Sequence, residues 1–96
     1  MNEDNYKPIL AAYLGNRLTV NEYITAFMEQ WKRDRDEAWS KPLRKESLRQ
    51  EQFHELMNRL FTSGDCYEEH PTAPWEISEE EVRQEVQLFY HRLWGA

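Results

Sequence analysis

The strongest constraint on the fold is a stripe of apolar residues that repeats with the period of an α-helix. From Val20 to Trp31 the successive apolar residues are three, one, three, one and three positions apart, so they share one face of a helix. The same pattern recurs over residues 9–14, 53–61 and 82–93. Because helices with one apolar face must pack those faces together, the sequence predicts an all-α, antiparallel four-helix bundle, a single domain over residues 1–96.

The first two helices have recognisable start and stop signals. We expect Asn5 to cap the first helix, with Pro8 tolerated in its first turn. Gly15 then ends that helix by adopting the left-handed conformation. The segment Thr19-Val-Asn-Glu22 is a capping box, which predicts the start of the second helix.

The second helix should continue to about Ala38, because Ser40-Lys41-Pro42 disfavours helix before the proline. We expect the third helix over about 46–61, ended by the turn residues Thr62-Ser-Gly-Asp65. The segment 62–77 is then a long connection, and connections of that length tend to be functional.

A second capping box, Ser78-Glu-Glu-Glu81, predicts the start of the fourth helix. In this box the Glu81 side chain should reach back to the Ser78 amide. The expected core positions of the fourth helix are Val82, Val86, Phe89 and Leu93.

Composition excludes several classes of protein. Four Trp, five Tyr and four Phe exclude a disordered chain, because that much aromatic surface has to be buried or bound. Three Gly and four Pro are too few for a β-sandwich with many turns. Without a long apolar run, and with polar residues directly after Met1, we expect neither a membrane span nor a signal peptide. One cysteine, Cys66, excludes an internal disulfide and fits a reducing compartment, so the expected location is the cytoplasm.

The excess of negative charge belongs to the last third of the chain. Residues 1–61 hold ten acidic and ten basic residues, whereas 62–96 hold eight acidic residues against Arg83 and Arg92, which accounts for the net charge of −6. Such a field attracts basic partners and repels nucleic acid, although a surface kept acidic for solubility would have the same charges. The basic residues from Lys32 to Arg49 alternate with acids, which favours ordinary helix surfaces over a nucleic-acid site.

The sequence contains no motif of a known catalytic or metal site. It has no phosphate-binding glycine loop, no His-Glu-x-x-His and no Cys-x-x-Cys. His70 could join Glu68 and Glu69 around a metal, but metal sites need three or four ligands, so a simple loop histidine is the better interpretation. Acidic neighbours disfavour a thiolate at Cys66. We therefore expect no enzyme, no cofactor and no metal.

The acidic segment also contains aromatic residues of the kind that anchor protein interfaces. Aromatic side chains can be buried against a partner while surrounding carboxylates steer association and bind Lys or Arg. Trp75 could be such an anchor, or it could pack across the connection as a lid on the core. Glu79 and Glu80 point away from the apolar stripe of their helix and are free to face a partner. The predicted binding residues are Asp65, Tyr67, Glu68, Glu69, Trp75, Glu76, Glu79 and Glu80.

Three segments resemble the colicin D-type immunity proteins of bacteria. Residues 13–27, Tyr-Leu-Gly-Asn-Arg-Leu-Thr-Val-Asn-Glu-Tyr-Ile-Thr-Ala-Phe, resemble that family's opening, where a short helix ends at a glycine and a hydroxyl residue caps the next helix. Residues 60–67, Leu-Phe-Thr-Ser-Gly-Asp-Cys-Tyr, resemble the segment in which a Leu-Phe pair leads to an Asp-rich turn and a Tyr. Residues 77–83 resemble the opening of its last helix, where a capping Ser and acids precede an apolar-Arg pair.

Two segments depart from the family pattern. The connection 68–75 is richer in Pro and Trp than the family's, and the basic stretch 41–49 has no counterpart. Both could change which toxin is recognised.

The resemblance implies a four-helix inhibitor of a secreted toxin, carried in the cytoplasm of the producing cell. The family's toxins are ribonucleases that cut transfer RNA, from colicins or from contact-dependent growth-inhibition systems. The implied partner is a cognate basic nuclease domain, whose cleft for the phosphate backbone an acidic surface can occupy. The protein itself should be a monomer when free and bind neither nucleic acid nor membrane. A general helical adaptor for another basic protein would fit the same charges, and a small enzyme or metal protein using His70 is the third possibility.

Overall fold

The protein is described by a computed structural model that covers residues 2–40 and 47–95, with residues 38–40 described by their backbone alone. Within these residues it forms four α-helices and no strand. The helices are α1 (Glu3–Leu14), α2 (Val20–Ser40), α3 (Leu48–Asp65) and α4 (Glu79–Trp94). The prediction of an all-α four-helix fold is confirmed.

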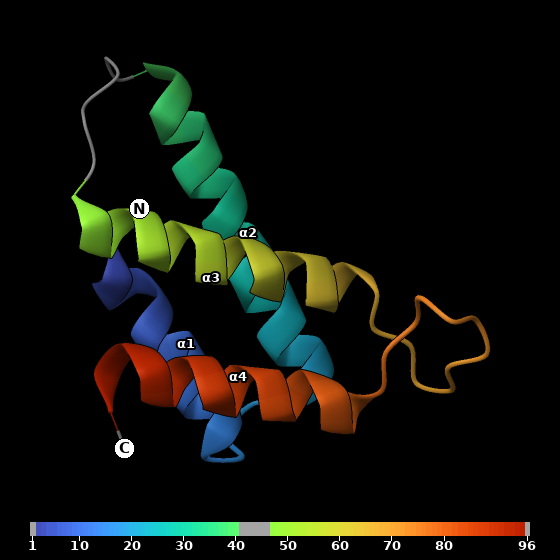
Figure 1. The fold of residues 1–96 in the computed structure, drawn as a ribbon. Helices are drawn as coiled ribbons and strands as arrows, with labels where there is room; N and C mark the ends of the chain where they lie inside the picture. Colours follow the sequence, from blue (N-terminus) through green and yellow to red (C-terminus); the bar gives the residue numbers. More distant parts are fainter. Residues whose placement is uncertain (1, 41–46, 96) are drawn as a thin grey trace.

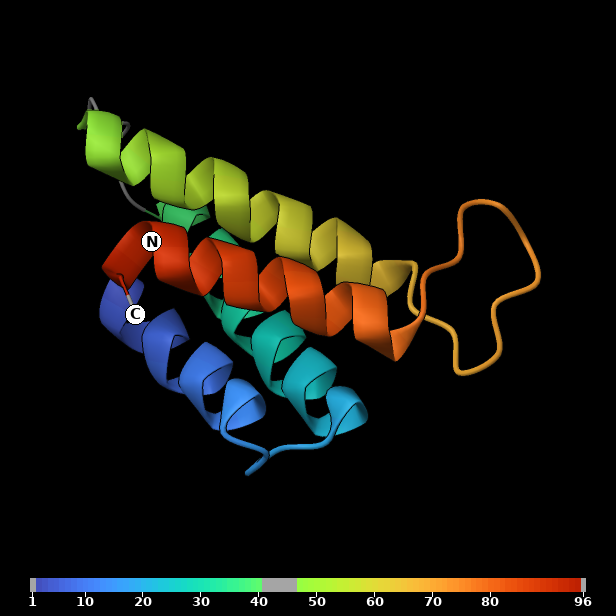
Figure 2. The same cartoon turned by 60° about the horizontal axis from the view of Figure 1, so that its bottom comes forward.

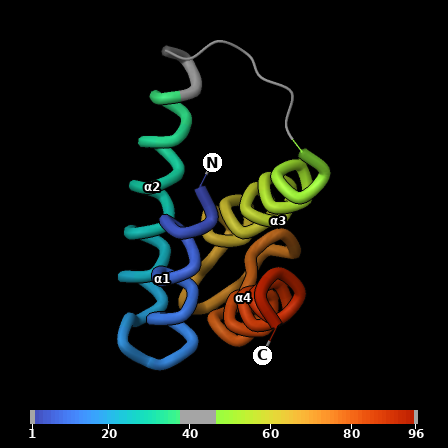
Figure 3. Tube along the Cα trace, turned by 90° about the vertical axis from the view of Figure 1, so that its left-hand side faces the viewer, coloured from blue at the N-terminus to red at the C-terminus, as the bar shows by residue number. Residues whose placement is uncertain are grey.

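The helices form two antiparallel hairpins, α1 with α2 and α3 with α4 (Figures 1 and 2). The first hairpin lies across the second, since α3 and α4 are seen almost end-on in Figure 3 while α1 and α2 run up the picture. Each helix packs mainly on two others, α1 on α2 and α4, and α3 on α2 and α4. The connection between α3 and α4 projects beyond the end of the bundle (Figure 2).

Tyr6 occupies the place where three helices meet. Its side chain is fully buried, and its ring packs edge-to-face on Phe27 of α2 at 5.4 Å and on Phe53 of α3 at 5.6 Å between centroids. Its hydroxyl donates a hydrogen bond to the carboxylate of Asp34 on α2. Burial, together with this hydrogen bond, raises the pKa of Tyr6. The phenol therefore stays neutral and remains a donor to Asp34.

Each predicted apolar stripe contributes to the core, with Ile24, Met28, Trp31 and Phe61 half-buried at its margin, and the first stripe begins earlier than expected. Ile9 and Leu14 were placed in the first stripe, but both are half-buried at its margin, and Tyr6 was missed. Accordingly, α1 begins at Glu3, about one turn of helix before the start that a cap at Asn5 predicts. The buried core residues are Tyr6, Leu10, Tyr13, Val20, Tyr23, Phe27, Phe53, Leu56, Met57, Leu60, Val82, Val86, Phe89 and Leu93.

The predicted start of α1 was wrong by three residues, whereas its predicted end before Gly15 is confirmed, although the left-handed residue there is a different one. Asn2, not Asn5, caps the helix, since its Oδ1 accepts the Asp4 N–H at 2.9 Å. Pro8 therefore lies in the second turn, where its missing N–H leaves the Asp4 carbonyl without its usual intrahelical donor. The left-handed residue after the helix is Asn16, at φ 61°, and not Gly15. Asparagine enters this region more readily than most residues, so the turn forms without glycine at that position.

The capping box that starts α2 is confirmed. Thr19 N–H donates to Glu22 Oε1 at 2.9 Å, and Glu22 N–H donates to Thr19 Oγ1 at 3.2 Å. At α4 only half of the predicted box forms among the described residues. Ser78 Oγ accepts the Glu81 N–H at 3.3 Å, without the return bond from the Glu81 side chain.

Helix α3 is longer at its C-terminal end than predicted. It begins after Ser47, whose reciprocal hydrogen bonds with Gln50 form a capping box that was not recognised in the sequence. It runs through the predicted turn 62–65 and ends at Asp65. Gly64 explains the difference, because a Cβ there would lie 3.2 Å from Cε of Met28. The glycine serves the close approach of α3 to α2, so it does not end the helix.

Helix α2 also runs past its predicted end near Ala38, to Ser40. The expected break at Lys41-Pro42 lies outside the described residues, as does most of the basic stretch 41–49.

A hydrogen-bonded brace joins the start of α1, the start of α3 and the end of α4. Arg49 holds the Glu3 carboxylate through two bonds, Nε to Oε2 at 3.0 Å and Nη2 to Oε1 at 2.7 Å. Arg49 Nη2 also donates to the Leu93 carbonyl at 2.7 Å, and Trp94 Nε1 donates to Glu3 Oε1 at 3.1 Å. The Arg49 hydrogen bond is the main reason that the pKa of Glu3 is lowered.

Replacing Thr19 by Ala should lower the free energy of unfolding by about 1 kcal/mol, because the oxygen that accepts the Glu22 N–H is lost. Thr25→Ala is the matched control, since Thr25 is exposed inside the same helix and should change stability by no more than about 0.5 kcal/mol. Chemical denaturation of the three proteins measures the difference. Equal midpoints for Thr19→Ala and the parent protein would contradict a stabilising box.

The brace should make stability depend on pH. Because the folded pKa of Glu3 lies below its ordinary value of 4.5, its contribution is complete above that value and is lost as the pH falls through the folded pKa. We expect the parent protein to lose more stability than Glu3→Gln between about pH 5 and pH 3, and the two to converge at the acid end. At neutral pH the substitution should cost less than about 1 kcal/mol, since the pair is partly exposed. Denaturation midpoints measured across this range test the expectation, and parallel curves would contradict it.

Candidate functional site

The predicted binding residues lie at one end of the bundle, where α3 ends, the connection projects and α4 begins (Figure 2). The carboxylate-bearing residues other than Glu76 are all exposed. We call the full set the acidic surface: Asp65, Tyr67, Glu68, Glu69, Trp75, Glu76, Glu79 and Glu80.

The two ends of the projecting loop are fastened to each other. Glu68 N–H donates to the Ile77 carbonyl at 3.0 Å, and Ile77 N–H donates to the Cys66 carbonyl at 3.0 Å, so Tyr67 and Ile77 form an isolated parallel bridge. The side chains of Tyr67 and Ile77 pack against the core. Residues 68–76 therefore leave the bundle from a fixed base.

Tyr67 is half-buried at this base, with acidic side chains around it. Burial raises the pKa of the Tyr67 hydroxyl, and the negative charges of Glu79, Glu69 and Glu68 raise it further. These three carboxylates, from the loop and from α4, thus all act electrostatically on the Tyr67 hydroxyl.

Trp75 lies away from the core. It is 71% exposed, so the possibility of a lid over the bundle does not hold. It occupies the second corner position of a turn in which Glu76 N–H donates to the Ala73 carbonyl at 3.1 Å, after Pro74 at the first corner. Proline is favoured at that first position, because its fixed φ matches the turn.

The carboxylate of Glu76 is used inside the loop. Its Oε1 accepts three hydrogen bonds, from Ala73 N–H at 2.6 Å and from the N–H and Oγ1 of Thr72 at 3.2 Å each. These bonds, the one from Ala73 first, lower the pKa of Glu76. Glu76 therefore closes the same turn through its side chain as well as through its backbone N–H.

The charges of the acidic surface are not neutralised by ion pairs within the described residues. The ion pairs of Arg35 with Asp36, Arg49 with Glu3 and Arg59 with Glu55 lie elsewhere. The nearest base along α4, Arg83, instead places its guanidinium 4.5 Å from the ring centroid of Tyr13 on α1. The negative field of this end is thus available to a partner.

The family model described as bacterial self-protective colicin-like immunity matches residues 1–93. The chain belongs to this family. It is an immunity protein of the colicin-like type, and the family indicates that it binds a toxin. No curated protein and no solved structure matches the chain.

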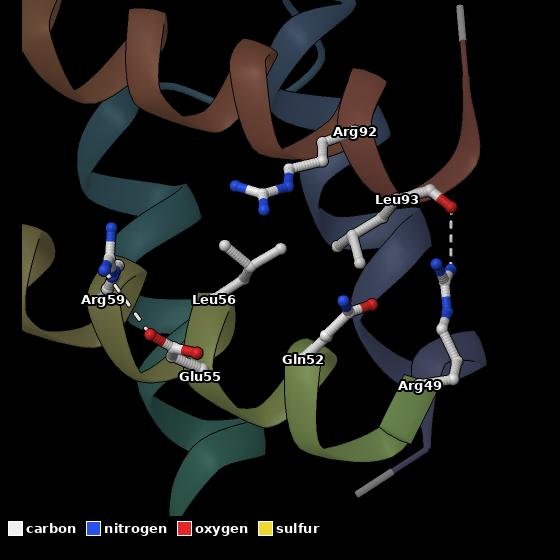
Figure 4. A pocket seen from close by; sticks show the side chains of 7 residues that line it. All are labelled: Arg49, Gln52, Glu55, Leu56, Arg59, Arg92 and Leu93. Carbon is white, nitrogen blue, oxygen red and sulfur yellow. Dashed lines mark hydrogen bonds and ion pairs between the residues drawn. The ribbon is translucent and has the colours of Figure 1, made fainter. Parts of the chain in front are cut away.

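A small pocket lies between α3 and α4, toward the end of this pair opposite the acidic surface. Its volume is about 120 Å³, and Figure 4 shows three arginines around it. Arg49 is bound to Glu3 and the Leu93 carbonyl, and Arg59 donates to Glu55 at 3.4 Å. Because two of the arginines already have acceptors, we interpret the pocket as part of the joint between the helices of the immunity protein. The lining residues are Arg49, Gln52, Glu55, Leu56, Arg59, Arg92 and Leu93.

The described part of the immunity protein offers no obvious metal site or membrane span. Its residues bring no group of three His, Cys, Asp or Glu together for a metal ion, and His70 is exposed. None of its helices has the length and apolar character needed to cross a membrane.

Sequence reasoning located the acids of the immunity protein but missed the residues that shape the loop. Thr72 and Ala73 supply the donors to Glu76, and Ile77 supplies the bridge. The segment from Ala73 to Glu76, Ala-Pro-Trp-Glu, has proline where a turn prefers it, and this signal could have predicted the turn. No local pattern predicts that Thr72 also reaches the Glu76 carboxylate.

We expect Glu76 to titrate below its ordinary value of 4.5 in the folded protein. Because the folded pKa is the lower one, the bonds stabilise the loop at higher pH and are lost as the pH falls through that pKa. Carbon NMR of the side-chain carboxyl should give this midpoint, and the amide signals of Thr72 and Ala73 should shift with the same midpoint. A midpoint at or above the ordinary value would contradict the observed loop geometry.

Proposed function

We propose that this immunity protein neutralises a toxic nuclease by covering its basic active-site cleft with the acidic surface. It performs no chemistry of its own in this proposal and needs no cofactor or metal. It acts as a monomer in the cytoplasm of the producing cell, without binding nucleic acid or membrane. Its partner is the cognate nuclease domain of a colicin or of a contact-dependent growth-inhibition toxin.

The observation that carries the proposal is the set of exposed carboxylates that form no ion pair within the described residues. Asp65, Glu68, Glu69, Glu79 and Glu80 are exposed at one end of the bundle, and Arg83 is engaged with Tyr13. Crowding like charges without counter-charges disfavours the free protein, and a partner that supplies Lys and Arg removes that cost.

A nuclease fits as this partner because of what its own substrate demands. A cleft that holds a phosphate backbone has to be lined by basic residues. Carboxylates spaced along a loop and a helix end can bind the same Lys and Arg side chains through charge-assisted hydrogen bonds. The resemblance to colicin D-type immunity proteins supports a ribonuclease that cuts transfer RNA.

In this proposal the residues of the acidic surface have different tasks. The exposed carboxylates steer association and bind basic groups, whereas Tyr67 and Trp75 supply apolar area. Tyr67 is fixed at the loop base and can contribute only the exposed part of its ring, while Trp75 is 71% exposed.

Reversing two loop charges, in Glu68→Lys/Glu69→Lys, should slow association with the toxin nuclease domain and weaken affinity by about tenfold or more, because a basic cleft then meets like charge. The matched control is Asp36→Lys/Glu51→Lys, which makes the same change of charge at exposed positions toward the other ends of α2 and α3. It should leave affinity within about threefold.

Stopped-flow measurements between about 0.05 and 0.5 M salt should also show the association rate of the parent protein falling steeply. A loop reversal that still neutralises the toxin at an equal molar ratio would refute this binding surface. A rate that does not depend on salt would refute electrostatic recognition.

A further inference from the structure

The most exposed aromatic feature of the acidic surface is Trp75. Three large apolar side chains are strongly exposed among the described residues: Leu48 at 80%, Trp75 at 71% and Leu88 at 62%. Leu48 and Leu88 lie in the first turn of α3 and in the second half of α4, away from the loop. Trp75 alone of the three lies in the chain segment 65–80 that carries the exposed carboxylates of the acidic surface. An indole gives the largest apolar contact area of any side chain, and leaving it in water gains the free protein nothing.

Trp75 is held in position by a turn that two sets of hydrogen bonds close. The first is the backbone bond from Glu76 N–H to the Ala73 carbonyl. The second is the set of bonds from Ala73 and Thr72 to Glu76 Oε1. At the base, the Tyr67–Ile77 bridge joins the loop to the core. A side chain presented on an already ordered loop can bind without the entropy cost of ordering that loop.

The position of Glu76 distinguishes it from the other acids. All three of its hydrogen bonds go to a single oxygen, Oε1, and the residue is half-buried while the other acids of the acidic surface are exposed. Oε1 with three donors has little capacity left for a partner, so a Lys or Arg could reach Glu76 only through Oε2, while Oε1 stays committed to the turn.

We propose that loop 68–76 is a preformed docking element whose Trp75 indole enters an apolar pocket of the toxin, and that Glu76 is a positioning residue that holds the turn. This inference rests on the proposed function. The pocket it requires is wide enough for an indole and is rimmed by Lys and Arg, because Glu68 and Glu69 precede the turn and Glu79 and Glu80 follow it in the chain. Trp75 then determines which nuclease is recognised, while the exposed carboxylates draw in any basic one.

The exposed Trp75 indole could be covered by a toxin or by a second copy of this chain, and charge complementarity decides between the two. Two copies meeting through Trp75 would bring the exposed acids of both loops together, and like charges across an interface oppose association. A basic protein would instead place Lys and Arg against these carboxylates, which favours association. The indole is therefore covered by the toxin.

The first experiment compares Trp75→Ala with the parent protein by calorimetric titration of the purified toxin nuclease domain. Trp75 lies on the surface, so its removal should leave the folding midpoint unchanged. We expect affinity to fall about 30-fold, as for an aromatic interface anchor, at a salt concentration where the charges are largely screened. Leu88→Ala is the matched control, as an exposed apolar residue away from the loop, and should change affinity by less than about threefold.

The second experiment separates positioning from charge at Glu76. Gln keeps a carbonyl oxygen in the place of Oε1 but removes the charge, whereas Ala removes both. A positioning role predicts that Glu76→Gln binds within about threefold of the parent and that Glu76→Ala loses about tenfold. At Glu68, whose side chain makes no hydrogen bond within the described residues, Gln and Ala should be equivalent.

Fluorine NMR of protein labelled with 5-fluorotryptophan provides a readout of the loop itself. The Trp75 signal, assigned by its loss in Trp75→Phe, should shift on toxin binding. In the free protein it should change in Glu76→Ala and not in Glu76→Gln. Amide exchange at Thr72 and Ala73 should quicken in Glu76→Ala alone.

The outcomes distinguish this inference from the function on which it rests. If the parent protein fails to bind or neutralise the nuclease, the proposed function fails. If the parent binds and Trp75→Ala binds equally well, the docking element is refuted while the function stands. Sedimentation showing that the free parent protein self-associates through Trp75 would also refute it. Equal losses for Glu76→Gln and Glu76→Ala would refute the positioning role.

Discussion

The burial of one tyrosine at the crossing of three helices determines the geometry of the rest of the molecule. Tyr6 contacts Phe27 and Phe53 through its ring and Asp34 through its hydroxyl, so α1 fixes how α2 and α3 cross. Further along the same pair of helices, Gly64 of α3 passes close to Met28 of α2, and α3 continues about one turn past its predicted end. The loop and the first turn of α4 begin where α3 ends. A side chain in the N-terminal helix thus sets where the acids of the last third are displayed.

Apolar periodicity predicted the helices well, because the 3.6-residue repeat is a local property and each stripe had to face a core. It predicted their ends less well, because the residue at which a helix ends also depends on the neighbouring helices that pack against it. Gly64 has the chemistry of a turn residue, but its neighbours on α2 make it a packing residue. Asn2 and Asn5 are equally suited to cap a helix, and the structure has Asn2 as the cap. Tyr6 stands three residues before Ile9 and extends the first stripe with the same spacing, so this pattern could have indicated that the buried face begins earlier.

In the candidate site, too, one part could be predicted from the sequence and another part could not. Counting charges was sufficient to find the acidic end, because net charge does not depend on conformation. The roles of individual residues do depend on it. Tyr67 and Trp75 look equivalent in the sequence, yet one is fixed at the base of the loop and the other is exposed on it. Glu76 looks like the other acids, yet its carboxylate faces inward to Thr72 and Ala73. A contact across a non-helical loop has no fixed spacing that would reveal it.

The bridge between Tyr67 and Ile77 separates loop 68–76 from the packing of the helices, and this separation affects how the protein can evolve. Both ends of the loop are secured by backbone hydrogen bonds, which any residue except proline can supply, and the side chains at the base belong to the core. Substitutions between them do not disturb the packing of the four helices. A bacterium whose toxin acquires a new surface can then alter its protection within this one segment, while inheriting the stability of the scaffold unchanged.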